Sequence, residues 1–258
     1  MNICICGTGK MGSWLAKELA VTHAVSVFDV DQNKSKTFRG VRILNKVGDI
    51  KDTAPDLFIN CVSLQNTIAS FRSVTPYLSE KCLLCDVASV KGELPAFYRE
   101  AGFRFVSLHP MFGPTFASLN DLKKENVVII SDSDGDGKDF FRGFFERSGV
   151  NIFEYSFNEH DVMMAYSLTL PFVSSMVFAS CVSTDVVPGT TFKRHLDVAR
   201  GLLSEDDFLL SEIIFNPHSL TQLEKISGRL NFLWHIIKNR DTGEAQRFFQ
   251  GLRKNVQE

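Results

Sequence analysis

Short apolar runs alternate with amphipathic stretches from the N-terminus to about Glu154. Two of the runs are continuously apolar, Leu57-Phe58-Ile59 and Cys82-Leu83-Leu84-Cys85, as expected for parallel strands that are covered on both faces. The alternation predicts an α/β fold built on a doubly wound parallel sheet. The predicted strands are Asn2–Cys6, Ala24–Phe28, Val41–Leu44, Leu57–Asn60, Cys82–Cys85, Arg104–Ser107, Val127–Ile130 and Asn151–Glu154. The predicted helices between them are Lys10–Val21, Gln65–Pro76, Gly92–Ala101 and Gly137–Ser148.

The rest of the chain shows helical periodicity and almost no strand pattern. The first of these helices is apolar on more than one face, and it contains Pro171, which should kink it. We expect its apolar surface to be buried in the core of a dimer. The chain is therefore predicted to hold two domains, residues 1–156 and an all-helical domain at residues 157–258. The predicted helices are Glu159–Thr184, Thr191–Leu203, Asp206–Phe215, Ser219–Asn239 and Thr242–Lys254.

Composition and charge narrow the possible classes of protein. With 258 residues, 44% of them hydrophobic, the chain can bury a sizeable core. The net charge of −2 gives no electrostatic reason to expect nucleic acid as a partner. No run approaches the roughly 20 apolar residues of a membrane span, and Met1-Asn2 leads directly into a strand, so we expect no signal peptide. Cys82 and Cys85 form a C-x-x-C on a strand rather than at a turn, so we expect a cytoplasmic protein with reduced thiols and no metal.

A glycine-rich motif joins the first predicted strand to the first predicted helix. It reads Gly7-Thr8-Gly9-Lys10-Met11-Gly12, the G-x-G-x-x-G pattern of the Rossmann-type dinucleotide-binding fold. The first glycine allows a tight turn, the second lets a pyrophosphate approach backbone N–H groups, and the third lets helix and strand pack closely. Asp29 ends the second strand 22 residues after Gly7, where an acid accepts bonds from ribose hydroxyls and repels a 2′-phosphate. No Arg follows Asp29 nearby, so the sequence favours NAD over NADP as cofactor.

Three further stretches follow later strands, at the edge of the sheet where open α/β folds bind ligands. Ser63 follows the fourth strand, Asp86–Lys91 the fifth and His109–Pro114 the sixth. His109 is a candidate general base, and Ser89 could orient its imidazole through a hydrogen bond. Lys91 could contact cofactor or substrate, or it could be only a cation at a helix start. The residues expected to contact the cofactor are Gly7, Gly9, Lys10, Met11, Gly12, Asp29, Ser63 and Ser89.

Together these motifs resemble the prephenate dehydrogenase family. The resemblance rests on the glycine motif, on D-x-x-S-V-K at Asp86–Lys91, on H-P-M-F-G-P at His109–Pro114 and on the helix start Glu159-His160-Asp161. It covers nearly the whole chain, and it implies the NAD-dependent oxidative decarboxylation of prephenate on the route to tyrosine. It also implies a homodimer joined through the helical domains, with His109 as the catalytic base and Ser89 as its hydrogen-bonding partner.

The chemistry of that reaction suits these residue types. Prephenate carries a hydroxyl on the ring carbon that loses hydride, and a neutral imidazole can accept the hydroxyl proton. Loss of the ring carboxylate then makes the ring aromatic. The two substrate carboxylates need positive partners. Lys193 and Arg200, seven residues apart, share a helix face and are the expected partners, whereas the alternative, Arg194, points about 100° away. His160 could also contact the substrate, or it could simply pack at the helix start.

The sequence departs from the family pattern in its substrate half, and this leaves alternatives open. Phe172 stands where many members have a second histidine, Thr115 stands where some have Glu, and the usual carboxylate-binding Arg has no clean match. The same chemistry on arogenate, in which an amino group replaces the side-chain keto group, is therefore an alternative. A β-hydroxyacid dehydrogenase would need a Lys on the first long helix, and Glu159–Thr184 contains none. A non-catalytic NAD-binding sensor would not need His109 together with Ser89.

Overall fold

The computed structural model describes residues 1–35, 38, 40–112, 122–183, 185 and 187–257. The chain forms two compact units, Met1–Val162 and Met163–Glu258. The division falls after Val162, whereas the sequence suggested residue 156, and His160 therefore belongs to the first unit.

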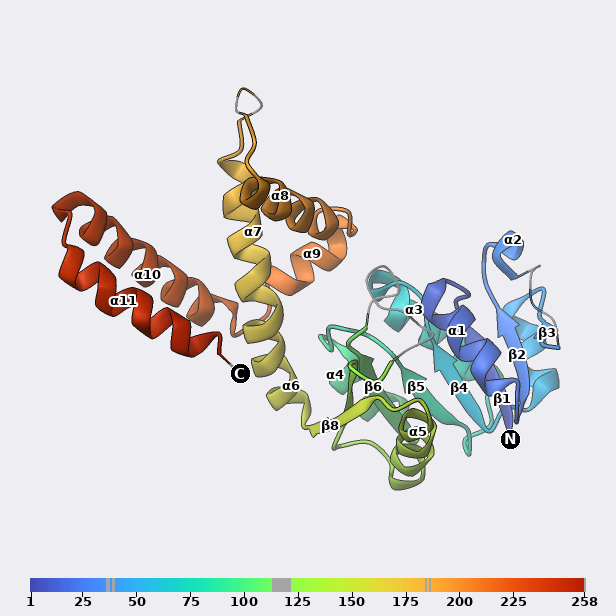
Figure 1. Cartoon of the computed structure of the whole chain (residues 1–258). Helices are drawn as coiled ribbons and strands as arrows, with labels where there is room; N and C mark the ends of the chain where they lie inside the picture. Colours follow the sequence, from blue (N-terminus) through green and yellow to red (C-terminus); the bar gives the residue numbers. More distant parts are fainter. Residues whose placement is uncertain (36–37, 39, 113–121, 184, 186, 258) are drawn as a thin grey trace. The chain divides into compact units, whose positions relative to one another are not determined.

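The first unit is built on one eight-stranded sheet with the strand order β3-β2-β1-β4-β5-β6-β7-β8. The order reverses direction between β1 and β4, which is the position where open α/β sheets form their ligand crevice. The ribbon of Figure 1 follows this order, with the N-terminus at β1. The strands are β1 (Asn2–Cys6), β2 (Ala24–Phe28), β3 (Arg42–Ile43), β4 (Leu57–Asn60), β5 (Leu83–Asp86), β6 (Phe105–Pro110), β7 (Asn126–Ile130) and β8 (Asn151–Tyr155).

The predicted doubly wound parallel sheet is confirmed, with one strand pair that runs in the opposite sense. β6 and β7 are antiparallel, and every other neighbouring pair is parallel. A parallel pair needs a crossover connection, usually a helix, and the described residues between Pro110 and Asn126 contain no helix. The antiparallel pairing also lengthens β6, because His109 pairs with Val128 and Pro110 with Val127. His109 therefore lies within a strand, whereas the sequence suggested a loop after Ser107.

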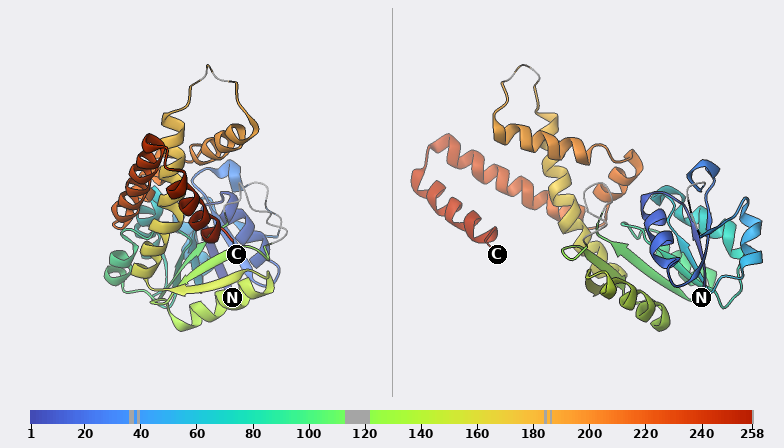
Figure 2. Two further views of the ribbon diagram at one scale, coloured as in Figure 1. Left: turned by 60° about the vertical axis from the view of Figure 1, so that its left-hand side comes forward. Right: turned by 45° about the vertical axis from the view of Figure 1, so that its right-hand side comes forward.

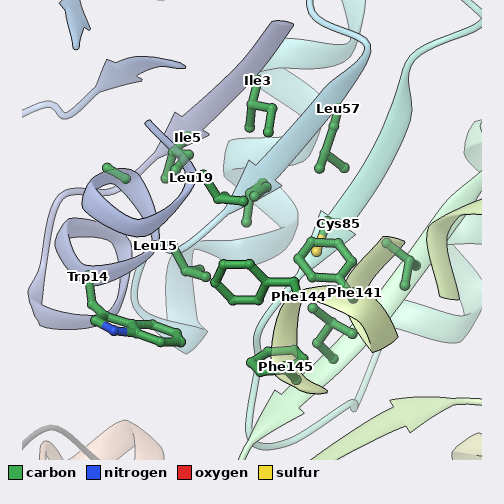
Figure 3. Packing of buried hydrophobic residues seen from close by; sticks show 14 of the residues in the cluster. Ile3, Ile5, Trp14, Leu15, Leu19, Leu57, Cys85, Phe141, Phe144 and Phe145 are labelled. Carbon is green, nitrogen blue, oxygen red and sulfur yellow. The ribbon is translucent and has the colours of Figure 1, made fainter. Parts of the chain in front are cut away.

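Helices α1 (Lys10–Leu19) and α5 (Gly135–Arg147) pack on one face of the sheet. Figure 3 shows the side chains of both helices meeting those of the central strands. Trp14 from α1 contacts the ring of Phe144 from α5 with 5.7 Å between ring centroids. The Phe-rich sequence of α5 is thus explained by core packing, with Phe141, Phe144 and Phe145 all buried.

The opposite face of the sheet is covered by α3 (Thr67–Val74), α4 (Leu94–Ala101) and the 3₁₀ segment η1 (Val47–Thr53). Phe71 stacks on Phe97 at 5.1 Å, and Tyr98 stacks on Phe105 of β6 at 4.1 Å. The shorter elements of this unit are α2 (Gln32–Ser35), η2 (Leu64–Asn66) and η3 (Thr75–Tyr77).

The described residues of the second unit form helices joined by turns, and no strand is present among them. Helix α6 (Phe157–Met164) leads into a π-helical turn, η4 (Ala165–Thr169), and then into α7 (Leu170–Ser180). Where the sequence suggested a kink, the π turn lies next to Pro171, which has no N–H to donate to the preceding turn. Figures 1 and 2 show α10 and α11 running side by side as a helical hairpin. The remaining helices are α8 (Thr190–Leu202), α9 (Asp207–Ile214), α10 (Ser219–Asn239) and α11 (Thr242–Asn255).

Helix α7 is apolar but is not buried within this single chain. None of its described residues is buried, and Val177 on α7 is 44% exposed. By length and composition alone, the helical stretch Phe157–Ser180 would suit a membrane span, contrary to the expectation from the sequence. Core helices of soluble proteins meet the same criterion. The burial of this helix in a dimer core stays a prediction.

Candidate active site

The loop between β1 and α1 contains three glycines. A side chain at Gly7 or Gly12 would collide with the backbone, whereas a side chain at Gly9 would point into open space. Gly7 has a φ of +89°, and a Cβ there would lie 2.6 Å from the carbonyl oxygen of Cys61. A Cβ on Gly12 would overlap the carbonyl oxygen of Gly7. A Cβ on Gly9 would meet nothing within 4 Å. Gly7 and Gly12 therefore permit close packing of the loop, while Gly9 leaves room for a ligand at the N-terminus of α1.

Asp29 lies at the end of β2 and is tied to the glycine loop. Its Oδ2 accepts hydrogen bonds from the Thr8 backbone N–H at 2.6 Å and the Thr8 hydroxyl at 2.9 Å, and its Oδ1 accepts one from the Asp31 N–H at 2.9 Å. Burial opposes ionisation, but the hydrogen bonds outweigh it and hold the pKa of Asp29 below its usual value. Asp29 therefore stays ionised, with spare lone pairs for hydroxyl donors.

A cavity of about 620 Å³ opens beside Asp29 within the first unit. Ser63, named from the sequence, lies in its wall, and its hydroxyl accepts a hydrogen bond from Asn66. Lys34 also lines the cavity, a cation that sequence reasoning missed because only the residues directly after Asp29 were considered. The turn of α2 brings it back toward the cavity. Other lining residues include Gly7, Gly9, Phe28, Cys61 and Val62.

These features fit a dinucleotide. The space at Gly9 lies at the positive end of α1, whose first turn carries no acidic side chain, so an anionic pyrophosphate suits it. Asp29 offers acceptors for ribose hydroxyls in the adjoining cavity. Lys10 and Met11 were also expected to contact the cofactor. Lys10 is exposed at the start of α1, and Met11 packs against the core.

Substitutions at Gly9 and Gly12 should have different effects, one on NAD binding and the other on the stability of the fold. Gly12→Ala should lower the free energy of unfolding by about 1–3 kcal/mol, because the overlapping atom belongs to the backbone. Gly9→Ala should leave that free energy within about 0.5 kcal/mol and should weaken NAD binding, because its methyl group fills the open space. Urea unfolding and NAD titration measure the two effects. An unchanged NAD affinity in Gly9→Ala would contradict the assignment of this space to the cofactor.

The placement of His109 follows from the alternation of side chains along β6. Phe105, Ser107 and His109 point to the same face of the sheet, and His109 is buried. Helix α6 begins with a capping box in which Ser156 and Glu159 bond each other's backbone N–H groups. The ring of Phe157 then packs against Phe105, with 6.1 Å between centroids. Residue 160, three positions later, lies on the same face of the helix and so meets the end of β6.

His109 pairs with His160 in the buried interior. The Nδ1 of His109 lies 3.0 Å from the Nε2 of His160, and the Nδ1 of His160 lies 3.2 Å from an oxygen of Asp161. Burial, with the nearby His160 and the cation of Lys91, holds the pKa of His109 well below its usual value. Burial also lowers the pKa of His160, although Asp161 opposes the shift. Both rings are therefore neutral near pH 7, and a neutral imidazole can accept a proton.

The structure places Lys91 in a buried ion pair. Its side chain is fully buried, so it is not an exposed helix-start cation. Its Nζ donates to Asp86 at 2.8 Å and to the carbonyl oxygen of Leu108 at 2.7 Å. The second carboxylate oxygen of Asp86 accepts from the Tyr98 hydroxyl at 2.7 Å. This buried cluster fixes the backbone directly before His109. Burial and the charge of Asp86 raise the pKa of Tyr98 well above its usual value, so the phenol remains a donor.

The sequence also placed Ser89 and the residues after Phe112 near His109. Ser89 is half-buried in the loop after β5, and the described contacts include no hydrogen bond between it and His109. Gly113, Pro114 and Thr115 lie outside the described residues.

The cations named as substrate contacts all lie on α8 of the second unit. Lys193 and Arg200 line one cavity of about 510 Å³, together with Phe192 and Asp197. Arg194 is not among its described lining residues, in keeping with the expected helical phase. Arg200 also lies 3.4 Å from an oxygen of Asp197 on its own helix.

A nucleotide-binding α/β unit followed by a helical unit, with a buried neutral histidine on β6, has the architecture of a dinucleotide-dependent dehydrogenase. Residues 15–152, more than half of the chain, match the family described as "Prephenate dehydrogenase, nucleotide-binding domain". The chain belongs to the prephenate dehydrogenase family, which also includes arogenate dehydrogenases and serves tyrosine biosynthesis.

Curated relatives and solved structures agree with this assignment. The chain is 26% identical to arogenate dehydrogenase 2, chloroplastic, from Arabidopsis thaliana, over 99% of this chain and 73% of that protein. It is 24% identical to a probable arogenate/prephenate dehydrogenase from Methanocaldococcus jannaschii, over 92% of this chain but only 56% of that protein. Its fold matches a prephenate dehydrogenase from A. aeolicus in complex with hydroxyphenyl propionate and NAD+ (TM-score 0.85, 19% identity, 99% of this chain and 96% of that chain). It also matches a Synechocystis arogenate dehydrogenase (TM-score 0.79, 20% identity, 99% and 98%).

Proposed function

We propose that the protein catalyses the oxidative decarboxylation of prephenate to 4-hydroxyphenylpyruvate, with NAD as hydride acceptor. The observation that carries this proposal is the buried, neutral His109 in the first unit, which also holds a loop and an acid suited to a dinucleotide. Family membership supplies the reaction class. The A. aeolicus structure with NAD+ and the presence of Asp29 support the choice of cofactor.

In this mechanism His109 accepts the proton of the ring hydroxyl through Nε2, since its Nδ1 already contacts His160. NAD, when bound, supplies the acceptor for the hydride that leaves the same carbon. Burial serves the step because it excludes water and keeps the imidazole unprotonated before the substrate binds. Loss of the ring carboxylate as carbon dioxide then completes the aromatic ring.

Four assays on the purified protein test the proposal: prephenate and arogenate, each with NAD and with NADP, following reduced cofactor by absorbance. Fastest turnover with prephenate and NAD is expected. Asp29 should repel a 2′-phosphate, although Lys34 lies in the same cavity. No turnover with either substrate would overturn the proposed activity, and equal kcat/KM for NAD and NADP would overturn the cofactor preference.

Arogenate is the second candidate substrate. The Arabidopsis relative is named as an arogenate dehydrogenase, and Phe172 replaces a histidine found in many family members. A higher kcat/KM for arogenate than for prephenate in the same assays would select this alternative and leave the role of His109 unchanged.

Substitutions on α8 should identify the groups that bind the substrate carboxylates. Lys193→Ala and Arg200→Ala should each raise KM for prephenate about tenfold or more, because charge-assisted hydrogen bonds are worth roughly 1.5–3 kcal/mol. NAD affinity should be unchanged. Arg194→Ala is the matched control, since Arg194 lies on the same helix but outside the cavity lining. A raised KM in Arg194→Ala alone would show that a different face of α8 binds the substrate.

We further propose that the protein is a cytoplasmic homodimer joined through the helical unit. The support is the apolar helix α7, which the single chain leaves without buried residues. Sedimentation equilibrium measures the mass directly. A monomer at micromolar concentration would overturn the proposal.

A further inference from the structure

We propose that Asp161 and His160 fix the tautomer of His109, so that the lone pair of His109 lies on Nε2, where the substrate proton arrives. The catalytic consequence rests on the function proposed above, whereas the tautomer itself is a property of the protein alone. In this scheme His160 and Asp161 are positioning residues. Neither needs to touch the substrate.

The direction of the chain of contacts follows from what each group can donate. An aspartate carboxylate only accepts hydrogen bonds, so the contact between Asp161 and the Nδ1 of His160 places the His160 proton on Nδ1. A neutral imidazole has one N–H, so the Nε2 of His160 is then an acceptor. The Nδ1 of His109, 3.0 Å away, must donate to it. The remaining nitrogen of His109, Nε2, therefore carries the lone pair.

This arrangement is needed because an isolated neutral histidine side chain favours the opposite tautomer, with the proton on Nε2. In that form His109 would present a donor to the substrate hydroxyl and could not accept its proton. The other charged groups near His109 do not hold its proton on Nδ1. Lys91 can only donate, and the described contacts of the Asp86 carboxylate are with Lys91, Tyr98 and the Ala88 N–H, not with His109.

The same contacts stabilise the positive charge that forms during the reaction. When Nε2 of His109 gains a proton, the proton on Nδ1 shifts toward the Nε2 of His160. The positive ring then lies beside the carboxylate of Asp161, which favours charge on His160, whereas the cation of Lys91 disfavours charge on both rings. When the ring carboxylate leaves as carbon dioxide, its electron pair makes the ring oxygen a phenolate, and the proton returns from Nε2 of His109 to that oxygen to form the phenol. The proton on Nε2 of His160 moves back to Nδ1 of His109, so each turnover leaves both rings in their starting state.

The test is nitrogen-15 NMR of histidine-labelled protein without cofactor or substrate, at a pH where both rings are neutral. The His109 signals are assigned by their loss in His109→Asn. Wild-type His109 should carry its proton on Nδ1. In His160→Phe, which preserves a buried ring but removes both nitrogens, His109 should shift mainly to the Nε2–H form. The kcat should fall about tenfold or more, with the NAD dissociation constant nearly unchanged.

Two further variants make the result decisive. Asp161→Ala removes only the acceptor at the outer end of the chain, and it should also raise the Nε2–H population of His109 and lower kcat. It carries the test if His160→Phe fails to fold. His23→Phe is the matched control, because His23 packs against Phe140 far along the chain from the site and should leave tautomer and kcat unchanged.

The outcomes distinguish this inference from the proposed function. An Nε2–H tautomer on wild-type His109 would overturn the inference whatever the enzyme's activity. Unchanged tautomer and kcat in both His160→Phe and Asp161→Ala would overturn it as well. An Nδ1–H tautomer that responds to both variants, in a protein inactive on prephenate and arogenate, would support the inference and reject the proposed function.

Discussion

Replacing His109 by Asn should lower turnover about 10²–10⁴-fold, the range expected when a general base is lost. Asn keeps a polar side chain of similar length, but it cannot accept a proton at neutral pH. NAD affinity should change little, because the glycine loop and Asp29 are untouched. Steady-state kinetics with prephenate and a separate NAD titration measure the two quantities. Turnover near that of the wild type would exclude His109 as the base.

The same base sets the pH dependence of the reaction. Only neutral His109 can accept the hydroxyl proton, so kcat/KM should fall as the pH drops through the pKa of His109. Burial lowers that pKa well below 6.5, so the fall should occur below this pH, and kcat/KM should not depend on His109 above it. An acid limb centred at or above pH 6.5 would contradict the buried, neutral state of the ring.

Replacing Lys91 by Met should lower the free energy of unfolding by about 3–5 kcal/mol, the usual cost of removing one partner from a buried ion pair. Met matches the length of the Lys stem. Among the described residues, the substitution leaves the buried carboxylate of Asp86 with the Tyr98 hydroxyl and the Ala88 N–H as donors, and it removes a donor from the Leu108 carbonyl. Urea unfolding followed by circular dichroism measures the change.

Lys46→Met is the matched control, because Lys46 is 80% exposed and lies 4.0 Å from Asp49. Surface pairs of this kind contribute about 0–1 kcal/mol. Combining Lys91→Met with Asp86→Asn should recover part of the lost stability, since no unpaired charge then remains buried. Equal stability of Lys91→Met and Lys46→Met would show that the buried pair contributes no more than a surface pair.

The parts of the fold that were predictable from sequence are those fixed by local pattern. Continuous apolar runs predicted β4 and β5, and the glycine motif with Asp29 predicted the nucleotide-binding loop, because each signal lies within a short segment. The sequence predicted a parallel sheet and did not reveal that β6 and β7 are antiparallel, because strand direction depends on partners distant in the chain. Pairing with β7 extends β6 through Pro110, so His109 lies in a strand where the sequence suggested a loop.

The site was predictable in its residue types but not in its contacts. A lysine such as Lys91 is normally expected at the surface, and only the fold reveals Asp86 and Leu108 as its partners. His160 was identified only as a candidate contact for the substrate, and its contact with His109 became visible in the structure. The capping box at Ser156 and Glu159 was a readable signal for where α6 begins. It would have placed residue 160 in the first turn of the helix.

The strand position of His109 has a consequence for how binding energy is used. A base on a loop must be ordered when the substrate arrives, and fixing one residue's backbone costs about 1–2 kcal/mol in conformational entropy. Here β5 pairs with β6 from Phe105 to Ser107, and the ladder with β7 continues from Leu108 to Pro110, one residue past the base. That entropy is therefore lost during folding, before any ligand is present. The free energy of substrate binding remains available for aligning the hydroxyl with the imidazole.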